Sequence, residues 1–163
     1  MSPPGKVEAK LEQLGLVLPE PMRLPHGVRL PFAFARVEGR HVYISGHGPQ
    51  APDGSLAPPQ GKVGADVSTE EAYEAARLTT LSILGTLKRE LGDLDRVTAW
   101  LRVFGMVNSA PGFTDQPSVI NGCSDRILEL YGPEVGGHAR SAVGMAELPF
   151  GIPVEIEAEI AID

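Results

Sequence analysis

The strictest constraint on the fold is the alternation in residues 154–162, which read VEIEAEIAI. Apolar and polar residues follow one another with a period of two, and residues two apart lie on the same face of a β-strand. The polar face of this predicted strand carries three carboxylates, Glu155, Glu157 and Glu159. The chain must therefore build a sheet that buries one face of this strand and leaves acidic side chains on the other.

A second predicted strand, residues 138–147, places one arginine among small residues. The same alternation puts Arg140 on one face with Ala142 and Gly144. A guanidinium group with this much room can bind a planar carboxylate through two parallel hydrogen bonds. The alternative is an ion pair between Arg140 and one of the glutamates of the last strand.

Two longer helices are expected between the strands. Residues 68–92 begin with an S-x-x-E capping box, carry apolar residues every three or four positions, and end at a glycine. A second helix is predicted over about residues 115–131, with Thr114 as N-cap and Gly132 as its stop. A short amphipathic helix is predicted within residues 6–16.

Three further segments have the composition of strands: residues 28–34, 41–45 and 97–107. The order of elements predicts an α+β fold in which two helices pack on one face of a mixed β-sheet, with a short N-terminal helix added. We expect a single domain over residues 25–163, preceded by a helical extension over residues 1–24. The other face of the sheet needs a cover, and a second subunit would provide it, so we expect a homo-oligomer.

Composition excludes several classes of protein. The chain has 163 residues and a net charge of −7, which argues against nucleic-acid binding because phosphate recognition depends on clustered basic residues. Cys123 is the only cysteine, so no intrachain disulfide can form, and its place among apolar residues predicts a buried side chain. No segment approaches ~18 consecutive apolar residues, and we expect a cytoplasmic protein without a membrane segment.

Several motifs, in order, resemble the RidA (YjgF) family, also labelled endoribonuclease L-PSP. The resemblance covers roughly residues 28–163 and implies a chorismate-mutase-like α+β fold and a homotrimer with clefts between its subunits. The stretch VNSAPGFTDQPSVINGCSD (107–125) is similar to a longer branch of the family. The other motifs are VYISGHGP (42–49), DVSTEEAYEAARLTTLSIL (66–84), HARSAVGMAELP (138–149) and VEIEAEIAI (154–162).

The resemblance also implies an activity, the hydrolysis of reactive enamines and imines such as 2-aminoacrylate to a 2-keto acid and ammonia. It assigns carboxylate binding to Arg140 and activation of water to Glu155, fifteen positions later. Further substrate contacts are implied for Ser45, Gly46 and Asn121. Backbone groups near residue 142 could hold the departing nitrogen. This mechanism requires no metal or organic cofactor, and the four histidines show no ligand spacing.

Three positions depart from the family pattern. Phe32 replaces a tyrosine, Ala142 replaces a cysteine, and His47 stands where glutamine often follows Ser-Gly. The first two changes remove a hydroxyl and a thiol from the expected cleft. They favour an alternative, a trimeric protein that binds small carboxylates without turnover, whereas Arg140 together with Glu155 favours the hydrolase.

We expect the last two strands to form a tight hairpin around residues 148–152. In that register Arg140 faces Ile160, about five residues or ~16 Å along the strand from Glu155. A site that uses both residues must then be assembled from two subunits. RNA cleavage, suggested only by the endoribonuclease label, is disfavoured by the acidic charge, and chorismate rearrangement rests on fold analogy alone.

Overall fold

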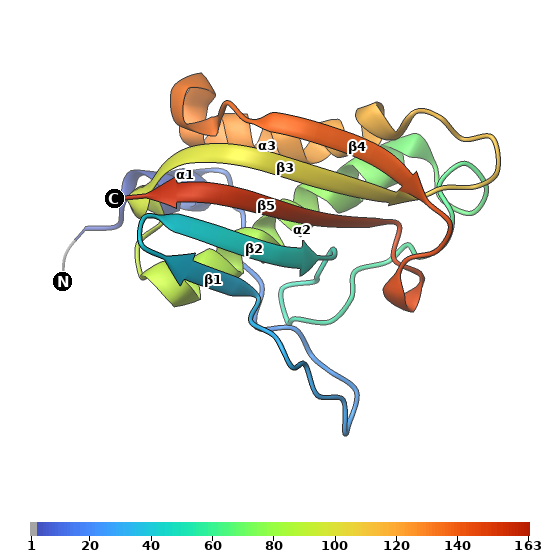
Figure 1. Cartoon of the computed structure of the whole chain (residues 1–163), viewed down its shortest axis with the longest axis horizontal. Coiled ribbons are helices and arrows are strands. Elements are labelled where there is room, and N and C mark those ends of the chain that lie inside the picture. Colours follow the sequence, from blue (N-terminus) through green and yellow to red (C-terminus); the bar gives the residue numbers. More distant parts are fainter. Residues whose placement is uncertain (1–2) are drawn as a thin grey trace.

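The computed structural model describes residues 3–163, and residues 1–2 of the predicted N-terminal extension lie outside the described part. Five strands form one sheet in the order β1-β2-β5-β3-β4 (Figure 1). The helices are α1 (Lys6–Gln13), α2 (Thr69–Leu91) and α3 (Gln116–Gly136), with 3-10 turns η1 (Leu94–Arg96) and η2 (Pro149–Gly151). The strands are β1 (Ala35–Glu38), β2 (His41–His47), β3 (Val97–Asn108), β4 (Ala139–Met145) and β5 (Val154–Ile162).

The sheet is mixed, as predicted, but the predicted hairpin of the last two strands is wrong. β4 pairs in parallel with β3, and β5 pairs antiparallel with both β2 and β3, so that β3 lies between the last two strands. Parallel neighbours need a crossover connection, and α3 provides it between β3 and β4. Arg140 consequently faces Val103 of β3 rather than Ile160.

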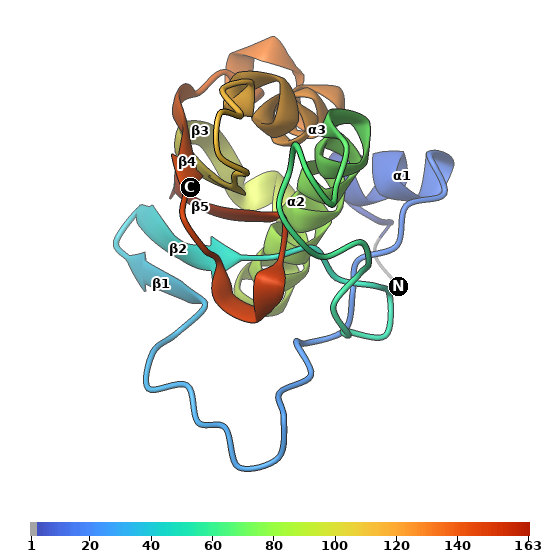
Figure 2. The same cartoon turned by 90° about the vertical axis from the view of Figure 1, so that its right-hand side faces the viewer.

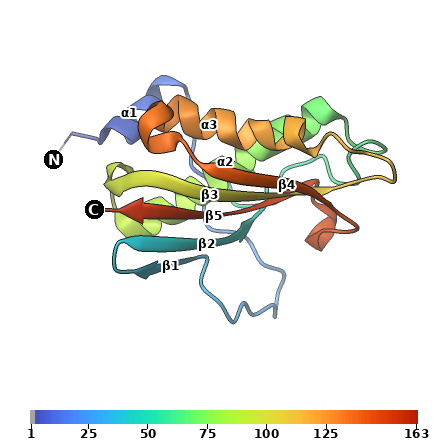
Figure 3. The ribbon, with the colours of Figure 1, turned by 45° about the horizontal axis from the view of Figure 1, so that its top comes forward.

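The two long helices cover one face of the sheet, as predicted (Figures 2 and 3). The core between the layers is aliphatic, and Val103 and Ile160 are fully buried in it. α2 begins at the predicted Ser68–Glu71 capping box and ends at Gly92, whose left-handed backbone (φ 79°) closes the helix. Cys123 is buried in the same core, also as predicted.

α3 starts one residue later than predicted and continues for one turn beyond its predicted stop. Its N-cap is Asp115 rather than Thr114, and Pro117 occupies the first turn, where a missing N–H costs no hydrogen bond. The regular helix stops at Gly132 as predicted, because this residue has φ 76° and ψ 171°. One more turn then extends to Gly136 before β4 begins.

Residues 28–34 are not a strand, contrary to the prediction. The first strand begins only at Ala35, and the preceding residues form a long irregular segment that extends away from the sheet (Figure 1). Pro31 lacks the N–H that a paired strand would donate. The apolar side chains on either side of it line a pocket instead of packing into the core. Backbone hydrogen bonds from Glu20 to Pro52 (2.9 Å) and from Arg23 to Gly54 (3.2 Å) fasten the start of this segment to the next loop.

The N-terminal helix α1 is part of the packed structure. Val7 and Leu11 are buried in the main core, and Asp95 accepts hydrogen bonds from the backbone N–H groups of Lys6 (2.7 Å) and Val7 (3.0 Å). Glu8 pairs with Lys88 of α2 at 2.9 Å. None of the helices in residues 3–163 combines the length and hydropathy that a membrane span requires.

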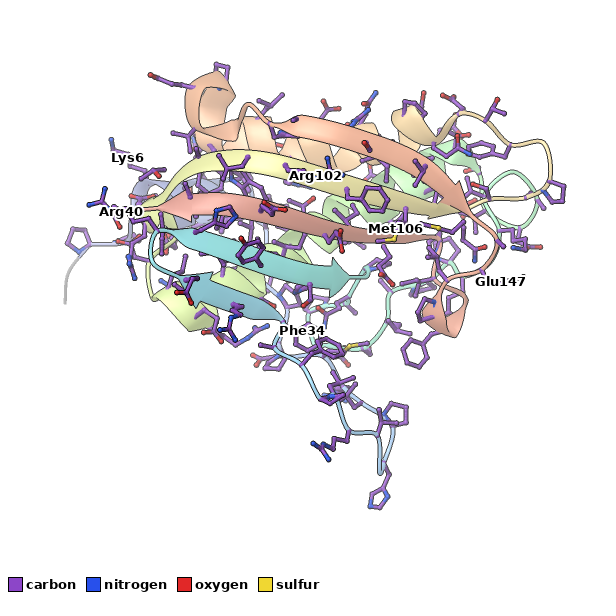
Figure 4. The ribbon with its side chains drawn as sticks, viewed as in Figure 1. Lys6, Phe34, Arg40, Arg102, Met106 and Glu147 are labelled. Atoms are coloured by element: carbon purple, nitrogen blue, oxygen red, sulfur yellow. The ribbon has the colours of Figure 1, made fainter. Side chains whose placement is uncertain are left out.

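No helix of residues 3–163 packs on the second face of the sheet. Arg102 and Met106 project from β3 on this side (Figure 4), next to the three glutamates of β5. Trp100 breaks the regular alternation of β3, because a register shift between Trp100 and Arg102 turns the indole toward the helices, where the residue is 1% exposed. We call the surface without helices the open face.

Candidate functional site

A pocket of about 580 Å³ lies where the irregular segment, the end of β2 and the turn η2 meet. This volume is within the range of small-molecule sites. The pocket includes four of the residues that the sequence singled out, and most of its other lining residues are apolar. Those four are Phe32, Gly46, His47 and Glu155.

Glu155 is the acidic group of the pocket wall. It lies on β5 opposite Met106 of β3, is half-buried, and has no hydrogen-bond or ion-pair partner within residues 3–163. Burial raises the pKa of this carboxyl group, and the neighbouring charge of Glu157 raises it further. A Cβ atom at Gly46 would overlap Oε2 of Glu155. The absence of a side chain at this glycine therefore leaves room for the carboxylate.

The side chains of Ser45 and His47, on either side of this glycine, are both fixed by hydrogen bonds within the chain. The hydroxyl of Ser45 donates to the backbone oxygen of Ala33 at 2.7 Å, which ties the irregular segment to β2. His47 Nδ1 lies 2.6 Å from the backbone oxygen of Ser45, and Nε2 lies 2.8 Å from the hydroxyl of Thr86. A carbonyl can only accept, so Nδ1 donates and Nε2 accepts from Thr86 in the neutral ring.

His47 is therefore a neutral wall residue. It is 5% exposed, and desolvation lowers the pKa of its imidazole to about 4, against the opposing effect of the Ser45 hydrogen bond. The positive charge of Arg89 lowers the pKa further. Both ring nitrogens are engaged, so His47 shapes the pocket rather than offering a free proton donor.

Arg140 lies in a different place, on the edge strand β4. Its Nη1 donates to Oδ1 of Asn121 at 2.8 Å and to the hydroxyl of Ser124 at 3.1 Å. His138 lies on the other side of Ser124, with Nε2 2.8 Å from its hydroxyl. These partners are neutral, and no carboxylate of residues 3–163 forms an ion pair with the guanidinium. The alternative of an ion pair between Arg140 and a glutamate of β5 is wrong for this chain.

Arg140 and Glu155 lie on opposite faces of the sheet. Arg140 is paired with Val103, whose side chain faces the helices, whereas Glu155 is paired with Met106, whose side chain is on the open face. Positions three apart on a regular strand point to opposite sides. The structure thus brings Phe32, Gly46 and His47 to Glu155, and it brings Asn121 to Arg140. The partly buried Ala142 packs against the core beside β3.

Sequence reasoning missed two groups of site residues. Ser124 contacts Arg140 because it lies one helical turn after Asn121, and this spacing of three could have revealed it. The sequence gives no sign of the apolar pocket wall formed by Met22, Leu24 and Leu30, because these residues lie in a segment without hydrophobic periodicity.

One group of acidic side chains has the spacing of a metal site in the described residues. Glu8, Asp93 and Asp95 offer oxygen atoms within 4.8 Å of one another. Structural contacts account for all three, because Asp95 caps α1, Asp93 accepts from the backbone of Asp95 (2.9 Å), and Glu8 binds Lys88. This cluster therefore serves to anchor α1.

The fold and the pocket together define a class: an α+β protein in which two helices cover one face of a mixed sheet, with a pocket of small-molecule size at the end of the central strands. A family model described as "YjgF/chorismate mutase-like, putative endoribonuclease" matches residues 8–152. The chain belongs to this YjgF (RidA) family, and the predicted chorismate-mutase-like fold is confirmed.

Individual relatives extend over nearly the whole chain. Protein TCP17 of Trypanosoma cruzi is 38% identical over 159 residues, which are 98% of this chain and 96% of the relative. The crystal structure of Atu1372 from Agrobacterium tumefaciens, a protein of unknown function, is 38% identical with a TM-score of 0.84, covering 97% of this chain and 92% of that one. A protein from Shewanella oneidensis described as a putative endoribonuclease is 30% identical with a TM-score of 0.85, covering 97% and 100%.

Proposed function

We propose that this protein hydrolyses 2-imino acids and their enamine tautomers, such as 2-aminoacrylate, to 2-keto acids and ammonia. The observation that carries the proposal is the carboxylate of Glu155, which is half-buried, unpaired within residues 3–163, and exposed to a pocket of small-molecule size. A raised pKa makes this carboxylate a better base toward water than an ordinary glutamate.

The reaction needs a group that binds the substrate carboxylate, a base that activates water, and an acid that protonates the leaving nitrogen. Arg140 binds the substrate carboxylate and fixes its orientation. Glu155 accepts a proton from a water molecule while the oxygen attacks the C=N carbon, and a carbinolamine forms. The substrate enters as the protonated imine, so this carbinolamine is neutral. Glu155 then passes its proton to the amino nitrogen, the carbinolamine hydroxyl gives its own proton back to Glu155 as the C–N bond breaks, and ammonia leaves as the carbon becomes a carbonyl. Ser45, Gly46 and the neutral His47 shape the wall beside Glu155.

The two charged groups must come from two subunits, because one chain carries them on opposite faces of its sheet. We therefore propose a homotrimer of the kind that the family resemblance implies, working in the cytoplasm. In this assembly the open face of one subunit is covered by another. Arg140 and Asn121 of one copy then complete the pocket that holds Glu155 of the next.

A second candidate is a trimer that binds small carboxylates without turnover. Phe32 and Ala142 favour it, since they remove the hydroxyl and the thiol that family members carry. RNA cleavage, which the family description suggests, has less support. The net charge of −7 and the row of glutamates on β5 oppose a phosphate backbone.

The direct test measures keto-acid and ammonia release from 2-imino acids generated in situ by an amino acid oxidase. Arg140→Ala should lower kcat/KM by roughly 10- to 100-fold, the effect expected for loss of hydrogen bonds to a charged group. Glu155→Gln should lower kcat by about 100-fold or more, as for loss of a general base. The wild-type rate should fall as the pH approaches the raised pKa of Glu155 from above, and this decline should disappear in Glu155→Gln.

The matched controls are Arg36→Ala and Glu38→Gln. These residues form an exposed pair on β1, with side chains 76% and 74% exposed, so both variants should keep wild-type rates. If the wild-type protein releases no more product than buffer while 2-keto acids still bind at Arg140, non-catalytic carboxylate binding replaces hydrolysis as the function.

A further inference from the structure

We propose that the pocket beside Glu155 selects 2-imino acids with a large apolar side chain, aromatic ones above all, over the single-carbon side chain of 2-aminoacrylate. This inference rests on the proposed function and names its substrate class. In this arrangement the substrate carboxylate reaches Arg140 of a neighbouring subunit, the C=N carbon lies at Glu155, and the side chain fills the pocket.

The walls of the pocket are chemically suited to such a group. The irregular segment, the loop before α2 and the turn η2 contribute mainly aliphatic and aromatic side chains. Burial of an apolar substrate group against them would be favourable, whereas a small substrate would leave most of the 580 Å³ unfilled. The apolar lining residues are Met22, Leu24, Val28, Leu30, Phe32, Phe34, Leu56, Phe150 and Ile152.

Three rings of the pocket lining contact one another in turn, from the exposed Phe32 to the buried His47. The rings of Phe32 and Phe34 meet edge to face with centroids 5.7 Å apart, and the ring of Phe34 lies 5.3 Å from the imidazole of His47. Aromatic rings prefer such offset and edge-on arrangements with one another. An aromatic substrate side chain can continue this row.

The charged groups of the pocket argue against a second substrate carboxylate. Glu155 and Glu90 are acidic, and Arg89 is the basic lining residue. Arg89 donates from Nη1 to the backbone oxygen of Pro19 at 3.1 Å and from Nη2 to the hydroxyl of Thr86 at 3.4 Å. Its guanidinium therefore holds the chain that leads into the irregular segment.

Phe150 provides an independent reason to assign this role. It has φ 60° and ψ 13°, the left-handed conformation that a phenylalanine adopts only at a cost, and the residue is 55% exposed. A glycine would fit the backbone better, and an exposed ring adds little to the core. The ring at the pocket rim is explained if it contacts a bound apolar group.

The test compares kcat/KM for imines generated in situ from phenylalanine, leucine and alanine. The phenylalanine-derived imine should be preferred over the alanine-derived imine by about tenfold or more, with leucine between them, from burial of the additional apolar surface. Equal values, or a preference for the alanine-derived imine, would overturn the proposal.

Phe150→Gly separates binding from folding. The variant relieves the left-handed backbone, so its melting temperature should not fall, but its preference for the phenylalanine-derived imine should decrease about tenfold. Phe32→Ser is a second variant, exposed enough (54%) to spare the fold. Leu14→Ala, which removes a 45% exposed apolar residue outside the pocket, should keep the wild-type preference. Unchanged selectivity in both pocket variants would refute the assignment.

A binding measurement keeps the two proposals distinguishable. If no imine is hydrolysed, the proposed function fails, and calorimetry with phenylpyruvate and pyruvate then tests the pocket alone. Binding of phenylpyruvate at least about tenfold tighter, lost in Phe150→Gly, would support the apolar pocket without turnover. Equal binding, or no binding because another subunit covers the pocket, would overturn it.

Discussion

The environment of Glu155 favours the reactivity that we propose for it over stability. A half-buried carboxylate without a hydrogen-bond donor is unfavourable when it is ionised, and a second glutamate two positions along the same face adds repulsion. The glycine at position 46 is what permits this placement, since any Cβ there would collide with the carboxylate. The destabilisation of the charged form is the property that a general base needs.

His47 has the opposite role, and a stability measurement can reveal it. Its pKa is about 4 in the folded protein, against an ordinary value of 6.5 for histidine, so the unfolded chain binds the proton first as the pH falls. The contribution of the neutral His47 to the free energy of unfolding is therefore fully present above pH 6.5, and it is lost as the pH falls toward 4. Between pH 7 and pH 4 the wild-type protein should lose on the order of 3 kcal/mol more than His47→Gln, which cannot titrate.

Denaturant unfolding at several pH values would check this prediction. His26→Gln, which changes an exposed histidine of the irregular segment, serves as the control and should follow the wild-type pH dependence. If His47→Gln and the wild-type protein lose the same stability on acidification, His47 is not a buried neutral histidine.

At the scale of elements, α3 and β4 act together to present one guanidinium group. Asn121 and Ser124 lie one turn apart on α3, and both oxygens accept from the same Nη1 of Arg140. Asn121 is exposed, so its loss should barely change stability. We therefore predict that Asn121 positions Arg140, to which we assign carboxylate binding.

Asn121→Ala should raise KM for a 2-imino acid by roughly 3- to 10-fold with a smaller effect on kcat, because an unfixed arginine binds the carboxylate less well in the ground state. Ser118→Ala, which removes a hydroxyl one turn earlier on α3, is the matched control. Steady-state kinetics would decide the matter, and a wild-type KM in Asn121→Ala would contradict the positioning role.

The elements also show what the sequence can and cannot predict. The 154–162 alternation and the Ser68–Gly92 helix were predicted with nearly their observed bounds, because period and capping are local signals. Strand order is not local: the hairpin prediction for β4 and β5 failed because β3 inserts between them. Residues 28–34 have the composition of a strand, yet they line a pocket, since apolar content alone does not distinguish the two.

At the scale of the whole molecule, the chain carries on separate surfaces the two charged groups that we propose to form one site. The sequence placed Arg140 and Glu155 too far apart to meet, and the structure gives a different reason, opposite faces of one sheet. The large pocket could not be predicted, because its wall comes from an irregular segment, η2 and the end of β2.

The open face has the character of a surface that another subunit covers. Tyr43 is 50% exposed on it, and a smaller hollow of about 250 Å³ lies between β2, β5 and β3. Arg102 projects from this surface near Glu157 and Glu159 but forms no ion pair with them in residues 3–163. A second copy of the chain could supply its counter-charge and cover the exposed ring.

Complementation between two inactive variants tests the central claim most directly. Arg140→Ala retains Glu155, and Glu155→Gln retains Arg140. A mixed oligomer therefore contains an intact site wherever Arg140 of one variant lies next to Glu155 of the other. After the two proteins are unfolded together and refolded as an equal mixture, roughly a quarter of the sites should be intact, and imine hydrolysis should recover to about that fraction of the wild-type rate. A mixture as inactive as its components, despite confirmed mixed oligomers, would contradict a site shared between subunits.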